Sequence, residues 1–189
     1  MRHQDYTVGW ICALPTELAA AQAMLDERHN PLQQDPDDHN TYLLGRIGVH
    51  NVVLACLPSG VTGTIAAATV AMQMLSSFKR LRFGLMVGIG GGAPSGENDI
   101  RLGDVVVSTP TGTSGGVVQY DFGKTLQEGR FIQTGSLNRP PNVLLTALAA
   151  LEAKLLGKDH GLSSHLSQMT VRYPNMEARF APPGTQHDW

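Results

Sequence analysis

The sequence predicts an α/β protein in which helices cover both faces of a mixed β-sheet. One observation is a set of short, almost continuous apolar runs, typical of strands buried on both faces. Another is that helix-forming segments separate these runs along the chain. The length of 189 residues also suits one domain that buries roughly 70% of the surface of its unfolded chain. We therefore expect a three-layer α/β/α sandwich formed by a single domain.

The first elements form a strand, a turn and a helix. Residues 6–14 are a nearly continuous apolar run and predict a buried strand, which Pro15 and Thr16 end. Residues 17–25 consist of Ala, Leu, Gln, Met and Glu, which favour a helix that has Pro15 or Thr16 near its start. Residues 30–40 are polar, with two prolines and three aspartates, and predict an exposed, solvated loop.

Two further strands and a helix follow. Residues 41–47 and 49–57 alternate or run apolar, and Gly45 and Gly48 permit a tight turn, so a hairpin is expected. Residues 64–78 have small side chains first and then Met, Leu and Phe at helical spacing, which predicts a buried helix.

The second half of the chain is richer in glycine and contains fewer predicted elements. Residues 82–89 form another apolar strand, and residues 104–109 (DVVVST) predict a further β-branched strand. Residues 142–156 predict an amphipathic helix. Residues 157–189 show little periodicity, so we expect an irregular tail after a core that spans residues 6–156.

Composition and charge exclude several classes of protein. The chain has 14 Lys and Arg residues against 16 Asp and Glu, a net charge of -2, which offers no basic surface for a phosphodiester backbone. No apolar stretch reaches the roughly 18 residues of a membrane span. We therefore expect neither a nucleic-acid nor a membrane partner. Cys12 and Cys56 lie in apolar runs and predict free thiols in a reducing cytoplasm. The 7 histidines lack metal-ligand spacing, so no metal site is predicted.

The most informative motif is the glycine-rich loop after the strand at residues 82–89. Gly88, Gly90, Gly91 and Gly92 lack Cβ atoms, so backbone N–H groups here can converge on an anion or a sugar hydroxyl. We predict that these glycines bind substrate or phosphate. The alternative is a tight turn between strands that binds nothing.

Two phosphate-binding motifs of other enzymes are disfavoured at this loop. Read as G-x-G-x-x-A, the loop would have to open a helix, which Pro94, Gly96 and Gly103 forbid, so a dehydrogenase is not predicted. A Walker loop is absent because no Gly-Lys-Ser/Thr follows the glycines.

Glu17 is the candidate catalytic residue. It follows the first predicted strand at the carboxyl end, where open α/β sheets bind ligands, and a carboxylate there could orient a water molecule. A glutamate in a first turn also stabilises a helix through its macrodipole, so both roles stay open. Tyr120 and Asp121 are a polar pair expected near the same edge, although Asp121 would also suit a turn.

Four segments taken together resemble the nucleoside phosphorylase superfamily, which includes purine nucleoside phosphorylases and methylthioadenosine/S-adenosylhomocysteine nucleosidases. The resemblance is greatest to the phosphorylase-like domain of fungal multidomain proteins of the NACHT/ankyrin type, and it covers residues 6–156 in the right order. The segments are WICALPTELAAAQAML, PSGVTGTIAAATVAMQML, VGIGGGAPSGENDIRLGDVVVS and GGVVQYDFGK.

The resemblance implies a mixed, partly barrel-like sheet and cleavage of the N-glycosidic bond of purine nucleosides by phosphate or water. It implies that the loop at residues 88–92 holds phosphate or the nucleophile beside the ribose, and that Glu17 activates water in hydrolytic members. Gly60, Tyr120 and Asp121 lie in the matching segments and are predicted to bind substrate. No cofactor is implied, inorganic phosphate being a possible co-substrate, and a homo-oligomer is expected.

The family takes two further acids from its late strands, a ribose-binding glutamate in a Met-Glu motif and an aspartate that protonates the departing base. No apolar strand is predicted after residue 156, and Glu177 in NMEA follows none, so we do not assign it this role. We therefore expect the domain to be incomplete. The alternative function is a non-catalytic nucleoside-binding, sensor or assembly module that keeps the fold without these acids.

Overall fold

The computed structural model describes residues 1–96, 98–157 and 161–180. These residues form two compact units, one of residues 1–90 together with those from 161 onward, and one of residues 91–157. The first unit contains the central sheet, and the second contains most of the glycine-rich half of the chain.

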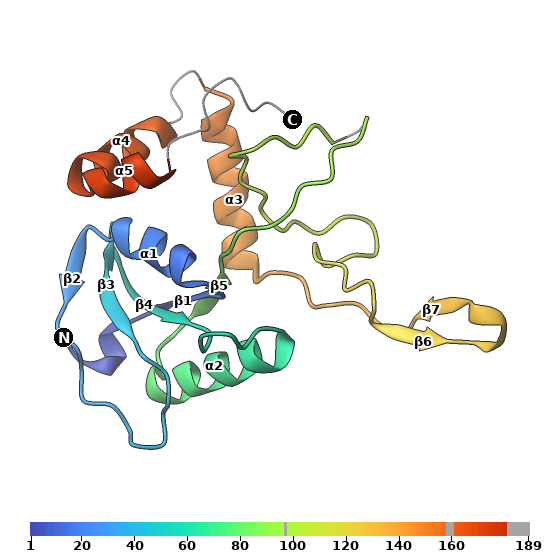
Figure 1. The fold of residues 1–189 in the computed structure, drawn as a ribbon, viewed down its shortest axis with the longest axis horizontal. Coiled ribbons are helices and arrows are strands. Elements are labelled where there is room, and N and C mark those ends of the chain that lie inside the picture. Colours follow the sequence, from blue (N-terminus) through green and yellow to red (C-terminus); the bar gives the residue numbers. More distant parts are fainter. Residues whose placement is uncertain (97, 158–160, 181–189) are drawn as a thin grey trace. The chain divides into compact units, whose positions relative to one another are not determined.

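A five-stranded sheet forms the centre of the first unit (Figure 1). Its strands are β1 (Val8–Cys12), β2 (Glu27–His29), β3 (Leu43–Ile47), β4 (His50–Cys56) and β5 (Phe83–Met86). They lie in the order β2-β3-β4-β1-β5. β1 pairs in parallel with β4 and β5, whereas β3 is antiparallel to β2 and β4. The mixed sheet predicted from the sequence is confirmed.

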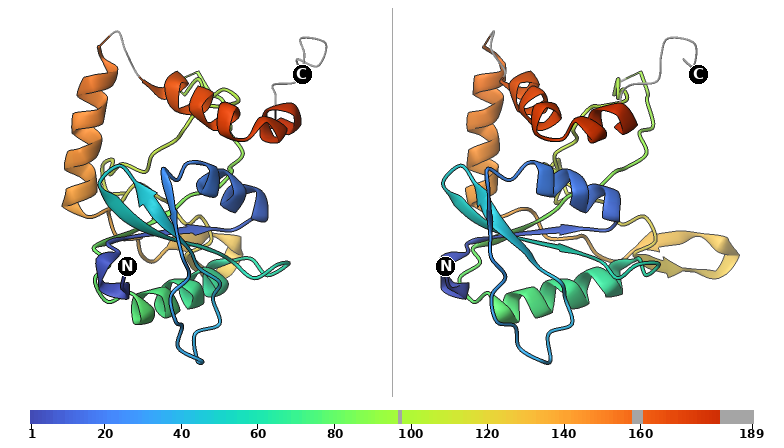
Figure 2. Two further views of the ribbon diagram at one scale, coloured as in Figure 1. Left: turned by 90° about the vertical axis from the view of Figure 1, so that its left-hand side faces the viewer. Right: turned by 60° about the vertical axis from the view of Figure 1, so that its left-hand side comes forward.

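Helices cover both faces of this sheet and give the three layers that were predicted. Helix α1 (Pro15–Ala23) lies on one face and α2 (Thr64–Ser77) on the other, as Figure 2 shows. The short η1 helix (His3–Asp5) precedes the first strand. No helix in the described ranges combines the length and the apolar character needed to cross a membrane.

Strand β4 shows why the buried runs are almost wholly apolar. Val52 and Leu54 pack in the cluster that includes α1, and Val53 and Ala55 pack in the cluster that includes α2. Successive side chains of a strand point to opposite faces, so a strand covered on both sides needs apolar residues at every position. Burying each Val or Leu side chain stabilises the fold by roughly 1.5–3 kcal/mol.

The predicted hairpin is confirmed, although its two glycines have different roles. β3 and β4 are antiparallel neighbours, and Gly48 lies in the turn with a φ of 57°, a conformation that favours glycine. Gly45 lies inside β3 and not in the turn. A Cβ there would lie 2.5 Å from the carbonyl oxygen of Glu27 on β2, so the close approach of the strands requires glycine.

Residues 30–40 form a loop that is mostly exposed, as predicted, but polar contacts also fasten this loop to α2. The carboxylate of Asp38 accepts hydrogen bonds from the Tyr42 hydroxyl (2.8 Å) and from the Ser77 hydroxyl at the end of α2. Asn40 donates through Nδ2 to a carbonyl oxygen of α2 (2.9 Å). Polar side chains that composition alone would place in solvent therefore hold this loop.

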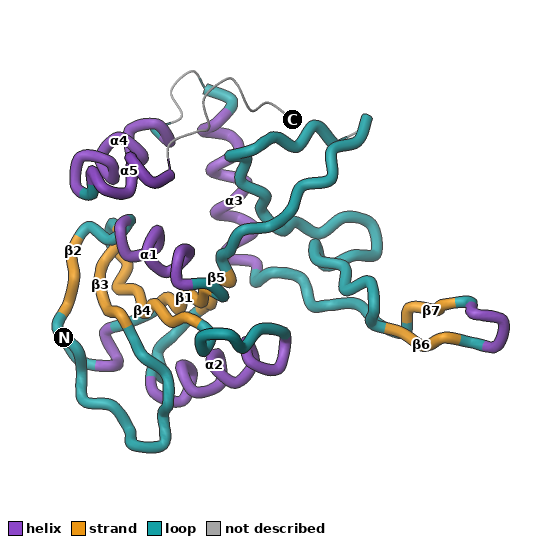
Figure 3. The backbone as a smooth tube through the Cα atoms, in the orientation of Figure 1, coloured by secondary structure: helices purple, strands orange, loops and turns teal. Residues whose placement is uncertain are grey.

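The second unit has few regular elements, as Figure 3 shows. They are β6 (Gly123–Thr125), η2 (Gln127–Gly129), β7 (Phe131–Gln133) and α3 (Asn142–Leu155). β6 and β7 pair antiparallel. The helix predicted at residues 142–156 is confirmed.

The strand predicted at residues 104–109 is wrong. These residues lie in a loop, where Val105 is 86% and Val106 is 76% exposed. β-branched residues favour a strand, but a strand also needs neighbouring backbone to pair with its N–H and C=O groups. No strand of the described ranges pairs with this segment.

The irregular tail predicted for residues 157–189 is wrong in its described part. Residues 162–180 form α4 (Leu162–Arg172) and α5 (Pro174–Phe180). Arg172 donates from Nη1 to the carbonyl oxygen of Leu25 (3.1 Å), so α4 contacts the chain just after α1. In α4, 5 of the 11 residues are Ser, Thr or His, whose helix propensity is weak, and the tertiary contact through Arg172 could not be predicted from the sequence. The rest of the tail lies outside the described residues.

Candidate functional site

Three parallel strands of the first unit end side by side and define the candidate site. β4, β1 and β5 are neighbours in this order, and Cys56 at the end of β4 is in register with Cys12 at the end of β1. The segments that leave the three strands carry Gly60, Glu17 and the start of the glycine-rich loop. Glu17 therefore lies at the carboxyl end of the first strand, as predicted, at the edge where α/β sheets bind ligands.

Glu17 joins two of these segments through its carboxylate. Oε2 accepts hydrogen bonds from the backbone N–H groups of Ala13 and Leu14, each at 2.8 Å, at the end of β1. Oε1 accepts one from the N–H of Ile89 (2.7 Å), shortly after β5. Glu17 is the third residue of α1, so its bond from Leu14 is the half of a capping box that a glutamate supplies.

Burial and hydrogen bonding act in opposite directions on the pKa of Glu17. The residue is 8% exposed, and burial raises its pKa, but the three N–H donors outweigh burial and hold the pKa below its ordinary value. Glu17 is therefore ionised at neutral pH and is a weak proton acceptor. Both oxygens of Glu17 already accept N–H donors in this arrangement, so the geometry does not assign a water molecule to the carboxylate. The role of Glu17 in activating water stays a prediction.

Gly88 is the glycine of the loop that contacts Glu17. A Cβ on Gly88 would lie 2.8 Å from Glu17 Oε1, closer than such atoms approach in proteins. Gly88 does not have a positive φ, so the space occupied by the carboxylate, and not the backbone conformation, requires glycine here. The structure thus brings together two of the predicted site residues.

Three of the other four predicted glycines have open surroundings. A Cβ on Gly60, Gly90 or Gly91 would meet no atom within 4 Å, whereas one on Gly92 would lie 2.9 Å from Ile100. Among the described residues, the N–H groups of Gly90 and Gly91 have no hydrogen-bond partner. Such groups can bind an anion or a hydroxyl, which is the property that the sequence predicted.

Tyr120 and Asp121 lie in the second unit, in the turn that leads into β6. Tyr120 is 87% exposed, and the carbonyl oxygen of Asp121 accepts a hydrogen bond from the N–H of Gly123 (3.1 Å). Asp121 therefore serves as a turn residue, which was the alternative reading. Binding of substrate by this pair stays a prediction.

Cys12 and Cys56 are neighbours at the same edge, which the sequence analysis missed. Both thiols are free, as predicted. Burial raises the pKa of Cys12 to about 11 and also raises the pKa of Cys56, so both stay protonated at neutral pH and are poor nucleophiles. Their equivalent positions near the ends of two buried apolar runs were the available signal.

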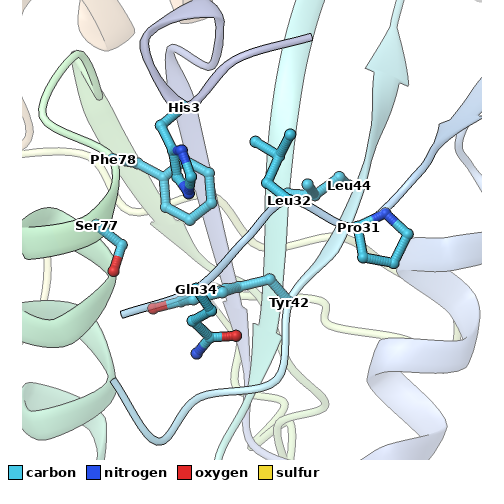
Figure 4. A pocket seen from close by; sticks show the side chains of 8 residues that line it. All are labelled: His3, Pro31, Leu32, Gln34, Tyr42, Leu44, Ser77 and Phe78. Atoms are coloured by element: carbon cyan, nitrogen blue, oxygen red, sulfur yellow. The ribbon is translucent and has the colours of Figure 1, made fainter. Parts of the chain in front are cut away.

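A small cavity lies beside the last residues of α2 (Figure 4). Its volume is about 40 Å³, enough for a few water molecules and too small for a nucleoside. The residues that line it are His3, Pro31, Leu32, Gln34, Tyr42, Leu44, Ser77 and Phe78. The predicted site residues are absent from this lining, so the cavity does not belong to the candidate site.

Comparison with known proteins adds relationships to this geometry. Over 158 residues the chain is 58% identical to a nucleotide-binding leucine-rich repeat (NLR)-like protein of Hyaloscypha variabilis, covering 82% of this chain and 16% of that protein. Over 127 residues it is 32% identical to the 5'-methylthioadenosine/S-adenosylhomocysteine nucleosidases of Mycobacterium bovis and Mycobacterium tuberculosis, covering 65% of this chain and 41% of each nucleosidase. No family model and no solved structure matches the chain.

The fold defines the chain as an α/β protein, and 127 of its residues align with two nucleosidases at 32% identity. A nucleosidase and a large fungal protein are the two kinds of relative expected from the resemblance of the four sequence segments. The chain spans 16% of the length of the fungal relative and 41% of the length of the nucleosidases. The activities of these longer proteins therefore enter only as proposals about this chain.

Proposed function

We propose that the chain binds purine nucleosides and cleaves their N-glycosidic bond with water or phosphate. The observation that carries the proposal is the edge formed by β4, β1 and β5, where a glycine-rich loop follows β5 beside Glu17 and the N–H groups of Gly90 and Gly91 have no hydrogen-bond partner among the described residues. The 32% identity to two 5'-methylthioadenosine/S-adenosylhomocysteine nucleosidases supports a nucleoside as the ligand.

The reaction breaks the bond from the anomeric carbon to the base nitrogen and forms a bond from that carbon to an oxygen of water or phosphate. As the carbon approaches an oxocarbenium state, the nucleophile must be held on one side and the leaving base must gain a proton on the other. The N–H groups of Gly90 and Gly91 suit the first task. We assign no residue to the second task, because the described chain after residue 161 forms α4 and α5 without a strand.

The direct test is chromatographic detection of free base after incubation of the 189-residue protein with adenosine, inosine, guanosine or methylthioadenosine, each with and without phosphate. Release only with phosphate would indicate a phosphorylase, and release without it a nucleosidase. Absence of release from folded protein would contradict an active enzyme in this chain.

A second candidate function is a nucleoside-binding module without turnover. The observation that favours it is the 58% identity to an NLR-like protein of which the aligned segment is 16%, so this segment accompanies a much longer chain there. The engaged carboxylate of Glu17 agrees with a binding role. Calorimetric binding of adenosine in the absence of base release distinguishes this function from the first.

The remaining expectations accompany the proposal. We propose that Gly60, Gly92, Tyr120 and Asp121 contribute to binding of the nucleoside. We also propose a cytoplasmic homo-oligomer that uses no cofactor apart from phosphate as a possible co-substrate.

A further inference from the structure

We propose that Glu17 is a positioning residue whose carboxylate fixes the glycine-rich loop against the turn between β1 and α1, with Gly88 supplying the space. We call these two residues, with the N–H groups of Ala13, Leu14 and Ile89, the carboxylate clasp. Its effect on a ligand rests on the proposed function. The clasp itself is a property of the chain without ligand and can be tested separately.

The hydrogen bonds of the clasp join segments that are far apart in sequence. Ala13 and Leu14 lie 4 and 3 residues from Glu17, whereas Ile89 lies 72 residues away. β1 and β5 are parallel neighbours, so one side chain can reach N–H groups that leave both strands. Because hydrogen bonds to an ionised acceptor are roughly twice as strong as neutral ones, this carboxylate sets the spacing of the two segments.

The absence of a side chain at Gly88 is the second part of the clasp. A Cβ there would lie 2.8 Å from Oε1, 3.2 Å from Cδ and 3.4 Å from Oε2 of Glu17. Alanine would push the carboxylate away and weaken its bond to Ile89, the next residue of the loop. Gly84 in β5 offers a matched control, because a Cβ there would meet its nearest atom at 4.0 Å.

The same contacts limit what else Glu17 can do in this arrangement. An ionised carboxylate offers about four acceptor sites, and backbone N–H groups occupy three of them. The residue is also buried. In this arrangement Glu17 would therefore act on a ligand chiefly through the backbone of the loop, and one acceptor site at most remains for a direct contact.

The first test uses the unaltered 189-residue chain and NMR. The amide shifts of Ala13, Leu14 and Ile89 and the carboxyl ¹³C shift of Glu17 are followed as the pH is lowered from about 7 to about 3. We expect all of them to share one midpoint below the ordinary value for glutamate. Amides that do not follow the carboxyl, or a midpoint at or above the ordinary value, would overturn the clasp.

The second test measures hydrogen exchange of the Ile89 amide in variants. We expect Gly88→Ala to accelerate exchange about tenfold and Gly84→Ala to leave it unchanged. In a Glu17→Ala background the effect of Gly88→Ala should disappear, because the group that the new methyl would displace is gone. Equal acceleration in both backgrounds would show that Gly88 does not act through Glu17.

The third test concerns the ligand, with inorganic phosphate and adenosine as the probes in calorimetry. For each probe that the unaltered chain binds, Gly88→Ala should weaken binding about tenfold and Gly84→Ala should not. If the unaltered chain binds neither, the proposed function fails while the NMR tests still decide the clasp. Undiminished binding in Gly88→Ala, with the Ile89 amide released, would overturn the positioning role.

Discussion

The two units of the chain contain similar apolar residues and use them in opposite ways. In the first unit, residues 52–55 of β4 are at most 2% exposed, because β3 and β1 pair with their backbone and helices cover both faces. In the second unit, Val105, Val106 and Val107 are 86%, 76% and 51% exposed. The difference shows that a β-branched run becomes a strand only where neighbouring segments supply hydrogen-bond partners and cover its side chains.

The largest effect is expected where a buried side chain of β4 is removed. Leu54→Ala removes a fully buried side chain and should lower the free energy of unfolding by about 2–5 kcal/mol. Val105→Ala, in the exposed run, should change it by less than about 0.5 kcal/mol. Urea unfolding of the two variants beside the unaltered protein measures both values. Similar losses would mean that the valine run is buried in solution.

The same contrast explains how much of the fold the sequence could predict. In the first unit, β1, α1, β3, β4, α2 and β5 were predicted within a few residues, because burial leaves an apolar pattern that is local in sequence, whereas the short β2 was not predicted. The segment at residues 104–109 carries the same pattern, but the partner that decides its structure is not encoded locally. The sequence analysis missed helix α4 because the local helix propensity of this segment is weak. The hydrogen bond from Arg172 to Leu25, which contributes to its position, joins residues that are far apart in sequence.

For the candidate site, the placement of Glu17 was predictable and its contacts were not. The position of Glu17 after a buried strand placed it at the carboxyl edge, and the structure confirms that placement. Its three hydrogen-bond donors are backbone N–H groups, which every residue except proline has, so the residue types at these positions could not predict the bonds. The link from Gly88 to Glu17 depends on β1 and β5 being neighbours, so only the sheet order could reveal it.

The next largest effect concerns the clasp within the first unit. Glu17→Gln places an amide N–H₂ against backbone N–H donors and should lower the free energy of unfolding by about 1–3 kcal/mol at neutral pH. Glu27→Gln is the control, because the ion pair of Glu27 with Arg46 is exposed and should contribute less than about 1 kcal/mol. Urea unfolding compares the two variants, and equal losses would contradict a special role for Glu17.

The stability difference at Glu17 should also depend on pH. Its pKa in the folded chain lies below the unfolded value of about 4.3, so in the window between the two pKa values the unfolded chain binds more protons. The contribution of Glu17 is therefore complete above about pH 4.3 and is lost as the pH falls through the folded pKa. The gap between the unaltered protein and Glu17→Gln should narrow over that range. A gap that widens on acidification would contradict the sign.

A smaller effect is expected from the hydrogen bond between Ser77 of α2 and Asp38 in the loop before β3. Burial raises the pKa of Asp38, but hydrogen bonds from the Ser77 hydroxyl and other donors lower it by more than burial raises it. The pKa therefore lies below its ordinary value, and Asp38 is ionised at neutral pH. Ser77→Ala should cost about 1 kcal/mol of stability and raise the pKa of Asp38. Ser76→Ala, at the exposed neighbouring position, should cost less than about 0.5 kcal/mol. Equal costs in urea unfolding would mean that the loop does not depend on Asp38.

The last comparison is between two glycines, and the smallest expected effect is the one at position 91. Gly48 in the hairpin turn has a φ of 57°, so Gly48→Ala should cost about 1–2 kcal/mol. Gly91, at the start of the second unit, has no positive φ, and a Cβ there would meet no atom within 4 Å, so Gly91→Ala should change stability by less than about 0.5 kcal/mol. Thermal unfolding measures both. Because the fold does not require glycine at position 91, weaker binding of phosphate or adenosine by Gly91→Ala would be an effect on the ligand, and unchanged binding would remove Gly91 from the proposed site.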